Sequence, residues 1–226
     1  MPEARTGSVV APIFQTSTFM MDTPGQTRAG FDYARTGTPN RSDLEQALCE
    51  LERATFAAAV NSGTSAEVAV FSALLRPGDE VILPRDVYGG TFRLLQNEYV
   101  RWGVAIRTVD LTDTGALAAA INENTAIIWV ETPSNPGLDI IDIAETARLA
   151  HASNALLAVD STFATPILQR PLELGADIVV HSTTKFINGH SDVIGGAVLT
   201  GDGTSCPRAA EVVDRLENHL ASVGLG

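Results

Sequence analysis

The chain has 226 residues, with 15 lysines and arginines against 27 aspartates and glutamates, so its formal net charge is −12. Hydrophobic residues make up 45% and charged residues 19%, a globular composition that excludes an intrinsically disordered protein. The acidic balance argues against a nucleic-acid-binding protein, because phosphate groups repel a net anion and no basic run offsets that charge. A chain of this length is expected to form one large domain, with or without an appendage.

Neither a membrane nor a metal ion is expected as a partner. No stretch approaches 18 consecutive apolar residues, and the first residues lack the apolar segment of a secretory signal. Cys49 and Cys206 are far apart, and neither has a second cysteine or a histidine at metal-ligand spacing. We therefore predict a cytoplasmic chain with two free thiols and no metal site.

Residues 1–40 are predicted to form an extended arm. They carry Gly7, Pro12, Pro24 and Gly25 among serines and threonines, and they show no helical period. An arm of this length needs a surface to lie on, which is either the body of the protein or a neighbouring subunit.

The first helix is expected from about residue 42 to residue 54. Leu44, Ala47 and Leu48 follow helical spacing, and Ser42 with Glu45 three residues later has the pattern of a capping box. This helix follows directly on the arm and opens the main part of the chain.

Short apolar runs then alternate with helical segments. Strands are predicted at 56–60, 80–83, 104–109, 125–130, 156–159 and 177–180, with a hairpin partner or antiparallel edge strand at 197–199. Helices are predicted at 66–75, 91–102, 114–121, 140–151 and 209–221. Apolar strands without polar alternation are buried on both faces, so the sequence predicts an α/β fold with a mostly parallel sheet and helices on both of its faces.

Polar residues follow five of the predicted strands, and ligands of such sheets collect at the carboxyl ends of strands. These five segments are residues 62–64, 86–90, 131–136, 160–162 and 181–185. A sheet does not need so many polar groups at one edge for its stability. We therefore expect the functional site at this edge.

Lys185 is the only lysine in the chain, and it follows a predicted strand among serines and threonines. This setting suits an amine of lowered pKa that forms a Schiff base, although a lone surface lysine is the alternative. Asp160 ends another predicted strand. A carboxylate there can hold a protonated pyridine nitrogen and make the ring an electron sink, whereas the alternative is a helix N-cap or turn residue.

The segment Ser62-Gly63-Thr64 precedes a predicted helix and is a candidate phosphate site. Free amide groups and the helix dipole favour an anion there, and Ser182 and Thr184 can add hydroxyl groups. The alternative is a simple strand-to-helix turn with its N-cap. The chain has no GxGxxG after its first strand and no GxxxxGK[ST], which disfavours a dinucleotide fold and excludes a P-loop.

Tyr88 and Asn135 stand in two further strand-end segments. A tyrosine among small residues, as in Tyr88-Gly89-Gly90, can lie flat on a planar cofactor and keep its hydroxyl free for proton transfer. The alternative is a turn or interface tyrosine. Asn135 can hydrogen-bond a ring hydroxyl, or it can serve only as a turn residue before a proline.

Together these sequence segments resemble the Cys/Met-metabolism (trans-sulfuration) family of enzymes that depend on pyridoxal 5'-phosphate (PLP). The resemblance runs from Gly7 to about Gly224, and its most specific part is the stretch from Asp177 to Asp192 around Lys185. It implies PLP as cofactor and the PLP fold-type I architecture of the aspartate-aminotransferase-like large domain. On this basis residues 41–208 form that domain.

The resemblance also implies a role for each site residue. Lys185 binds the cofactor aldehyde, Asp160 pairs with the pyridine nitrogen, Asn135 contacts the ring 3-oxygen, and Tyr88 stacks on the ring and assists proton transfer. The phosphate is held by the amides of Gly63 and Thr64 with Ser182 and Thr184, and Thr162 belongs to the same cofactor site. Tyr33 and Arg35 match a pair that the family donates to the phosphate in a neighbouring subunit, which suits a bidentate arginine.

Three positions depart from the family pattern, and the chain also ends early relative to it. Thr64 replaces a frequent methionine, Ser161 replaces a frequent asparagine, and Gly90 stands where methionine γ-lyases typically have a cysteine. Residues 209–226 resemble the start of a connecting helix, and the C-terminal substrate domain with its carboxylate-binding arginine is expected to be absent.

The activity implied by the resemblance is γ-replacement or γ-elimination on sulfur amino acids or homoserine esters, of the cystathionine γ-synthase or γ-lyase type. The partners are then a small amino-acid substrate and other copies of the chain, in a homodimer or homotetramer with shared active sites. One alternative is a truncated PLP-binding fragment with little or no activity. A further alternative is a methionine γ-lyase or a homoserine-ester sulfhydrylase.

Overall fold

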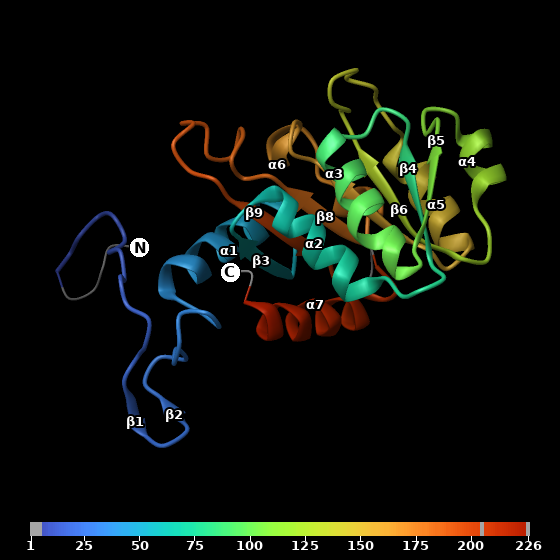
Figure 1. The fold of residues 1–226 in the computed structure, drawn as a ribbon. Coiled ribbons are helices and arrows are strands. Elements are labelled where there is room, and N and C mark those ends of the chain that lie inside the picture. The colour runs from blue at the N-terminus through green and yellow to red at the C-terminus, as the bar shows by residue number, and fades with distance from the viewer. Residues whose placement is uncertain (1–5, 204–205, 225–226) are drawn as a thin grey trace.

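The computed structural model describes residues 6–203 and 206–224, which fold around one mixed sheet of seven strands (Figure 1). The strand order is β3-β9-β8-β7-β6-β4-β5. β9 runs antiparallel to both of its neighbours, and the other pairs are parallel. The strands are β3 (Phe56–Val60), β4 (Glu80–Pro84), β5 (Ala105–Val109), β6 (Thr125–Glu131), β7 (Leu156–Asp160), β8 (Ile178–His181) and β9 (Gly196–Thr200).

Helices cover both faces of this sheet. The helices are α1 (Pro39–Glu52), α2 (Gly63–Leu74), α3 (Gly89–Leu94), α4 (Thr114–Ala120), α5 (Ile143–Ala152), α6 (Thr165–Leu168) and α7 (Ala209–Val223). Three short turns of helix complete the set: η1 (Leu95–Tyr99), η2 (Val100–Trp102) and η3 (Pro171–Leu174). α2, η1 and α7 contribute to the core on one face, whereas α4 and α5 pack on the other and α1 packs there beneath β8 and β9.

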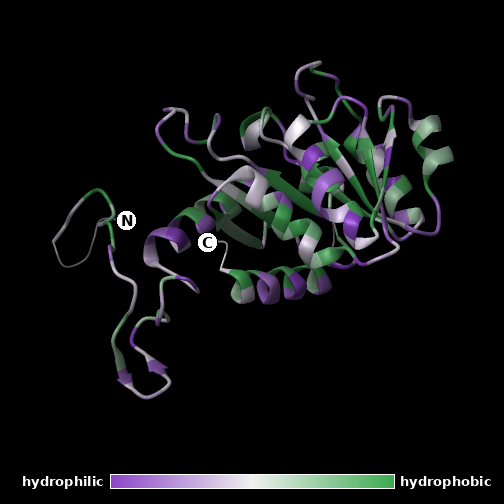
Figure 2. Cartoon of the chain, in the orientation of Figure 1, coloured by the Kyte–Doolittle hydropathy of each residue, from purple (hydrophilic) through white to green (hydrophobic). Residues whose placement is uncertain are grey.

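The strands form these layers because their side chains are apolar on both faces. In β6, Ile127 and Trp129 point into the core on one face, and Ile128 and Val130 point into the core on the other. All four are fully buried. Figure 2 shows the same pattern, with hydrophobic strands at the centre and helices of mixed character outside them. The predicted α/β fold with helices on both faces is therefore confirmed.

Residues 6–38 form an extended segment that runs away from the sheet (Figure 1), whereas the predicted arm, residues 1–40, includes the first two residues of α1. The extended segment contains a small hairpin of β1 (Met21–Thr23) and β2 (Gln26–Thr27), which the sequence reasoning missed although Pro24-Gly25 is a turn signal. A bridge between Thr18 and Tyr33 closes the loop. Residues 1–5 of the predicted arm and 225–226 of the predicted connecting segment lie outside the described residues.

One local prediction was wrong. α1 begins at Pro39 with Thr38 as its N-cap, so Ser42 lies inside the helix and makes no capping box, because Pro39 suits the first helical position. Glu45 instead accepts a hydrogen bond at 2.9 Å from the amide of Ala59 on the edge strand β3.

The strand predicted at 197–199 is β9. Of the two alternatives, the hairpin partner is confirmed, because β9 pairs antiparallel with the preceding strand β8. It also pairs with β3 on its other side, so it is not an edge strand.

The predicted helix at 91–102 is also less regular than expected. α3 gives way to a π-helical turn in η1 and a 3₁₀ turn in η2. Cys49 and Cys206 are free thiols, as predicted. No helix within residues 6–203 and 206–224 is long and apolar enough to cross a membrane.

A substitution at Phe71 tests the packing of the core between α2 and the sheet. It is fully buried, and its ring contacts Tyr99 and Trp129 at centroid distances of 5.6 and 5.0 Å. We expect Phe71→Ala to lower the free energy of unfolding by roughly 3–5 kcal/mol, because it leaves a cavity. The control is Phe92→Ala at a 39% exposed position, where a cost below about 1 kcal/mol is expected. Equal costs for both variants in urea unfolding would contradict this account of the core.

Candidate functional site

A cavity of about 280 Å³ opens at the carboxyl ends of β3, β6, β7 and β8. It brings together all the predicted site residues except Tyr33 and Arg35. The residues that line it are Ser62, Gly63, Thr64, Glu67, Tyr88, Glu131, Asn135, Asp160, Thr162, Phe163, Ser182, Thr184, Lys185 and Ile194. The convergence of strand ends that the sequence predicts is therefore present, and it forms a single site.

One wall of the cavity is the N-terminus of α2. Ser62 caps this helix, since its side chain accepts a hydrogen bond at 3.1 Å from the amide of Ser65. A Cβ atom on Gly63 would lie 2.7 Å from the Cβ of Ser182, so only glycine lets the helix start approach β8 this closely. The free amides at the helix start and the Ser182 hydroxyl therefore lie at the same cavity, which Thr184 also lines, an arrangement suited to an anion.

Asp160 and Thr162 connect β7 to β8 beside that wall. The amide of Thr162 donates to Asp160 Oδ1 at 2.9 Å, and the amide of Ser182 donates to Thr162 Oγ1 at 2.8 Å. Burial raises the pKa of Asp160, while the hydrogen bonds from Thr162 and the neighbouring His181 act in the opposite direction. These contacts fix a carboxyl group at the sheet edge, next to the candidate anion site.

Lys185 lies at the mouth of the cavity on the turn after β8, and its side chain is exposed rather than enclosed. Its backbone amide donates to the carbonyl of Ser182 at 3.2 Å. The neighbouring Thr184 hydroxyl exchanges hydrogen bonds with Gly195, at 3.1 Å to its carbonyl and 3.0 Å from its amide. The turn that carries the only amine side chain is thus held against the start of β9.

Tyr88 forms another side of the cavity, and Asn135 lines it as well. The amide of Tyr88 donates to Glu131 Oε2 at 2.6 Å. A Cβ atom on Gly90 would lie only 2.2 Å from the Tyr88 ring, so the ring folds back over that glycine. Tyr88 is 42% exposed.

Sequence reasoning missed three lining residues, Glu67, Phe163 and Ile194, and it placed Ser62 and Glu131 in strand-end segments at this edge without naming them as site residues. Glu67 is 3% exposed and Glu131 is 6% exposed. Burial, reinforced by the charge of Asp160, raises the pKa of each to about 8. A signal was present for both, since Glu131 is the last residue of β6 and Glu67 is an acid in an otherwise apolar helix.

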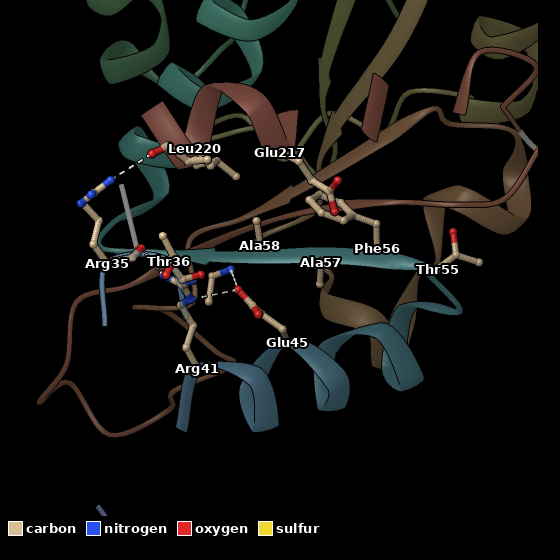
Figure 3. Close-up of a pocket in the computed structure, with 12 residues that line it drawn as sticks. Arg35, Thr36, Arg41, Glu45, Thr55, Phe56, Ala57, Ala58, Glu217 and Leu220 are labelled. Carbon is tan, nitrogen blue, oxygen red and sulfur yellow. Dashed lines mark hydrogen bonds and ion pairs between the residues drawn. The ribbon is translucent and has the colours of Figure 1, made fainter. Parts of the chain in front are cut away.

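Tyr33 and Arg35 lie outside this cavity. Arg35 stacks over the Tyr33 ring at 5.5 Å, and its Nη1 atom donates to the carbonyl of Ala221 at 3.1 Å. It borders a second cavity of about 460 Å³ between α1, β3 and α7, where Figure 3 shows its side chain directed at the end of α7. Their predicted role concerns the site of a neighbouring subunit, and it stays a prediction.

The arrangement defines the chemistry that this cavity can support. It has anion donors at one end, a buried carboxyl group at β7, an aromatic ring at one side and a primary amine at its mouth. Among residues 6–203 and 206–224, no group of three or more histidines, cysteines or acids could hold a metal ion. The donor set and the Gly63 cradle fit a planar, phosphate-bearing aldehyde such as PLP.

Comparison with known proteins gives the same chemistry. The family model described as Cys/Met metabolism PLP-dependent enzyme matches residues 1–222. Cystathionine gamma-synthase of Mycobacterium tuberculosis is 52% identical over 201 residues, which are 89% of this chain and 52% of the relative. Cystathionine beta-lyase of Coxiella burnetii is 42% identical over 223 residues, 98% of this chain and 56% of that protein.

Solved structures agree with the sequence relatives. The crystal structure of cystathionine gamma-lyase from Lactobacillus plantarum complexed with L-serine superposes with a TM-score of 0.91 at 40% identity. The match covers 99% of this chain and 56% of that one. This chain therefore spans about half the length of the relatives that it matches.

The buried Glu67 makes stability depend on pH. The folded protein keeps the Glu67 proton up to about pH 8, whereas the unfolded chain releases it near pH 4.5. A raised pKa contributes stability below the unfolded value, and this contribution is lost as the pH rises from 4.5 toward 8. Glutamine does not titrate, so Glu67→Gln should make the free energy of unfolding fall less steeply with pH. The difference in slope is at most about 1.4 kcal/mol per pH unit, the contribution of one titrating group.

Urea unfolding at pH 5, 6, 7 and 8 measures this difference. The matched control is Glu145→Gln on α5, because hydrogen bonds from Arg148 lower the pKa of Glu145 and its titration lies below this pH window. Identical pH slopes for the wild-type protein and Glu67→Gln would show that Glu67 does not hold its proton.

Proposed function

Because this chain belongs to the Cys/Met-metabolism family of PLP-dependent enzymes, we propose that its cavity binds PLP and serves reactions of sulfur-containing amino acids. The observation that carries the proposal is the meeting of Lys185, Asp160 and the Gly63–Ser182 contact around one cavity. The chain spans about half the length of its curated relatives, so the activity of the whole protein is part of the proposal.

Each lining residue that the sequence predicts has a place in the proposed complex. The amides of Gly63 and Thr64 with the hydroxyl of Ser182 would hold the phosphate, and Lys185 Nζ would bind the aldehyde. Thr184 would join them once its hydroxyl proton turns from the Gly195 carbonyl to the phosphate. Asp160 accepts a hydrogen bond from the pyridine nitrogen, and Thr162 keeps that carboxylate in place. Asn135 contacts the ring 3-oxygen, and Tyr88 lies on the ring face.

The chemistry then divides between the cofactor and the side chains. Bound in this way, PLP acts as an electron sink for negative charge at the Cα atom of an amino acid. Once the amino group of the substrate has replaced Lys185 at the aldehyde, the freed Lys185 Nζ would remove the proton from Cα and return protons later in the reaction. Asp160 keeps a proton on the ring nitrogen. The Tyr88 hydroxyl or Lys185 Nζ delivers a proton to the departing γ-substituent.

The proposed substrates are sulfur amino acids or homoserine esters, converted by γ-replacement or γ-elimination in the manner of a cystathionine γ-synthase or γ-lyase. Relatives named cystathionine gamma-synthase and gamma-lyase support this substrate class. The beta-lyase relative adds cleavage at the β position as an activity that the sequence reasoning did not consider. Gly90 counts against the methionine γ-lyase branch.

We also propose a domain organisation and an assembly for the protein. Residues 1–40 serve as an arm that reaches a neighbouring subunit, where Tyr33 and Arg35 contact the phosphate. Residues 41–208 form the PLP-binding domain, and residues 209–226 begin the connection to a substrate domain. The exposed arm supports this division, and the assembly is proposed to be a homodimer or homotetramer in the cytoplasm.

Reduction with borohydride tests cofactor binding directly, because the chain has one lysine. Protein mixed with PLP should develop a visible absorbance band that Lys185→Ala abolishes. After reduction, peptide mapping by mass spectrometry should place the pyridoxyl group on Lys185. A label confined to the N-terminal amine, or a band that persists in Lys185→Ala, would overturn the proposed site.

Product analysis tests the reaction. The PLP-loaded chain is incubated separately with cystathionine, with O-succinylhomoserine plus cysteine, and with methionine. α-Ketobutyrate from cystathionine indicates a γ-lyase, and cystathionine from the ester indicates a γ-synthase. Pyruvate from cystathionine would instead identify a β-lyase, and PLP binding without any product would leave a cofactor-binding fragment.

A further inference from the structure

The segment from Tyr88 to Thr91 is held at both ends by hydrogen bonds to buried carboxyl groups. At its start, the amide of Tyr88 donates to Glu131 Oε2 at 2.6 Å. At its end, Thr91 Oγ1 donates to Glu67 Oε1 at 2.7 Å. The two acids come from different elements, β6 and α2, and both line the candidate cofactor cavity.

The residues that make these two hydrogen bonds are largely buried, so the hydrogen bonds offset a cost of burial. Thr91 is fully buried, and Glu67 and Glu131 are 3% and 6% exposed. Burying an acid costs free energy unless its oxygens are hydrogen-bonded, and each acid satisfies one oxygen through this segment. Glu67 Oε2 is buried with no partner among the described residues, so the contact to Thr91 is its main compensation.

The position of the Tyr88 ring depends on how this segment is held. Tyr88 is 42% exposed, and its ring lies over Gly90, where a Cβ atom would approach to 2.2 Å. Gly89 and Gly90 begin α3, and the amide of Phe92 donates to the carbonyl of Tyr88 at 3.3 Å, so the first turn of this helix also restrains the segment. The contacts with Glu67 and Glu131 join this turn to α2 and β6 and thereby set the ring at the side of the cavity.

We propose that Glu67 and Glu131 are positioning residues that fix the segment 88–91 and thereby set the Tyr88 ring against the bound cofactor. This inference rests on the proposed function only for the identity of the ligand that the ring meets. The geometry of the free protein is sufficient for the positioning itself.

The charge state of the two acids fits this role. Burial, with the charge of Asp160 as a further cause, raises the pKa of both to about 8, so both are mainly protonated at neutral pH. A protonated carboxyl group still accepts a hydrogen bond through its carbonyl oxygen. Two uncharged acids also avoid repulsion with Asp160 and with a phosphate.

Fluorine NMR of protein labelled with 3-fluorotyrosine reports on the ring directly. The chain has three tyrosines, Tyr33, Tyr88 and Tyr99, so three signals can be assigned by single phenylalanine substitutions. Gly90→Ala is the positive control because it must displace the ring, whereas Gly89→Ala meets only Arg93 Nη1 at 3.4 Å and should leave the ring in place.

The substitutions at each acid come in pairs. Glu131→Leu and Glu67→Leu remove the acceptor and should shift or split the Tyr88 signal without moving those of Tyr33 and Tyr99. Glu131→Gln and Glu67→Gln keep an acceptor of the same shape and should restore the wild-type signal. An unmoved Tyr88 signal in both leucine variants, or equal shifts in the glutamine variants, would overturn the proposal.

Thr91→Val covers the case in which a leucine variant fails to fold, which a changed signal from the buried Tyr99 would reveal. It removes only the hydroxyl that donates to Glu67, and it should move the Tyr88 signal. Thr146→Val is its matched control, because Thr146 is equally buried and its hydroxyl donates to Asp142 on α5, away from the cavity. A Tyr88 signal unchanged by Thr91→Val would contradict the role of Glu67.

PLP binding provides a second readout. A ring that has lost its position should weaken PLP affinity by about tenfold in the leucine variants, the effect of one lost buried hydrogen bond, and much less in the glutamine variants. If the wild-type protein binds no PLP, the proposed function fails while the NMR result still decides the positioning role. Unchanged PLP affinity alongside a displaced ring would refute the contact between Tyr88 and the cofactor.

Discussion

The close approach of Gly63 to Ser182 is the constraint on which the candidate site depends. β9 pairs with both β3 and β8, which sets the end of β3 near the end of β8. Without a side chain on Gly63, the start of α2 can pack directly on Ser182. Two segments distant in sequence therefore form one anion cradle, and the remaining groups are placed around it by the ends of β6, β7 and β8.

This cradle also bears on how an acidic chain could hold the proposed phosphate. The net charge of −12 disfavours anions over the molecule as a whole. The lining of the cavity includes three acids, but burial raises the pKa of Glu67 and Glu131 to about 8, so these two carry little negative charge at neutral pH. The amides and hydroxyl groups that line the cavity can then attract an anion without strong repulsion from these two acids, and the one lysine adds a positive charge at the mouth.

The sequence predicted the sheet and most of the site because both follow from local patterns. Buried strands read as apolar runs, and the polar residues after them meet at one edge of a parallel sheet. The missed features depend on tertiary contacts. α1 starts at Thr38 and Pro39 rather than at Ser42, and β9 pairs with β3 as well as with β8. Glu67 lines the cavity and accepts a hydrogen bond from Thr91, a contact that no local sequence pattern indicates. Tyr33 and Arg35 could not be placed at a site, because their predicted site belongs to a neighbouring subunit.

A diffraction structure of the chain crystallised with PLP would test the central claim most directly. We predict the phosphate at the amides of Gly63 and Thr64 and beside Ser182, the pyridine nitrogen within hydrogen-bond distance of Asp160, and continuous density to Lys185 Nζ. The Tyr88 ring should lie on the face of the cofactor. PLP bound outside this cavity, or bound in it with its phosphate directed at Asp160, would contradict the account.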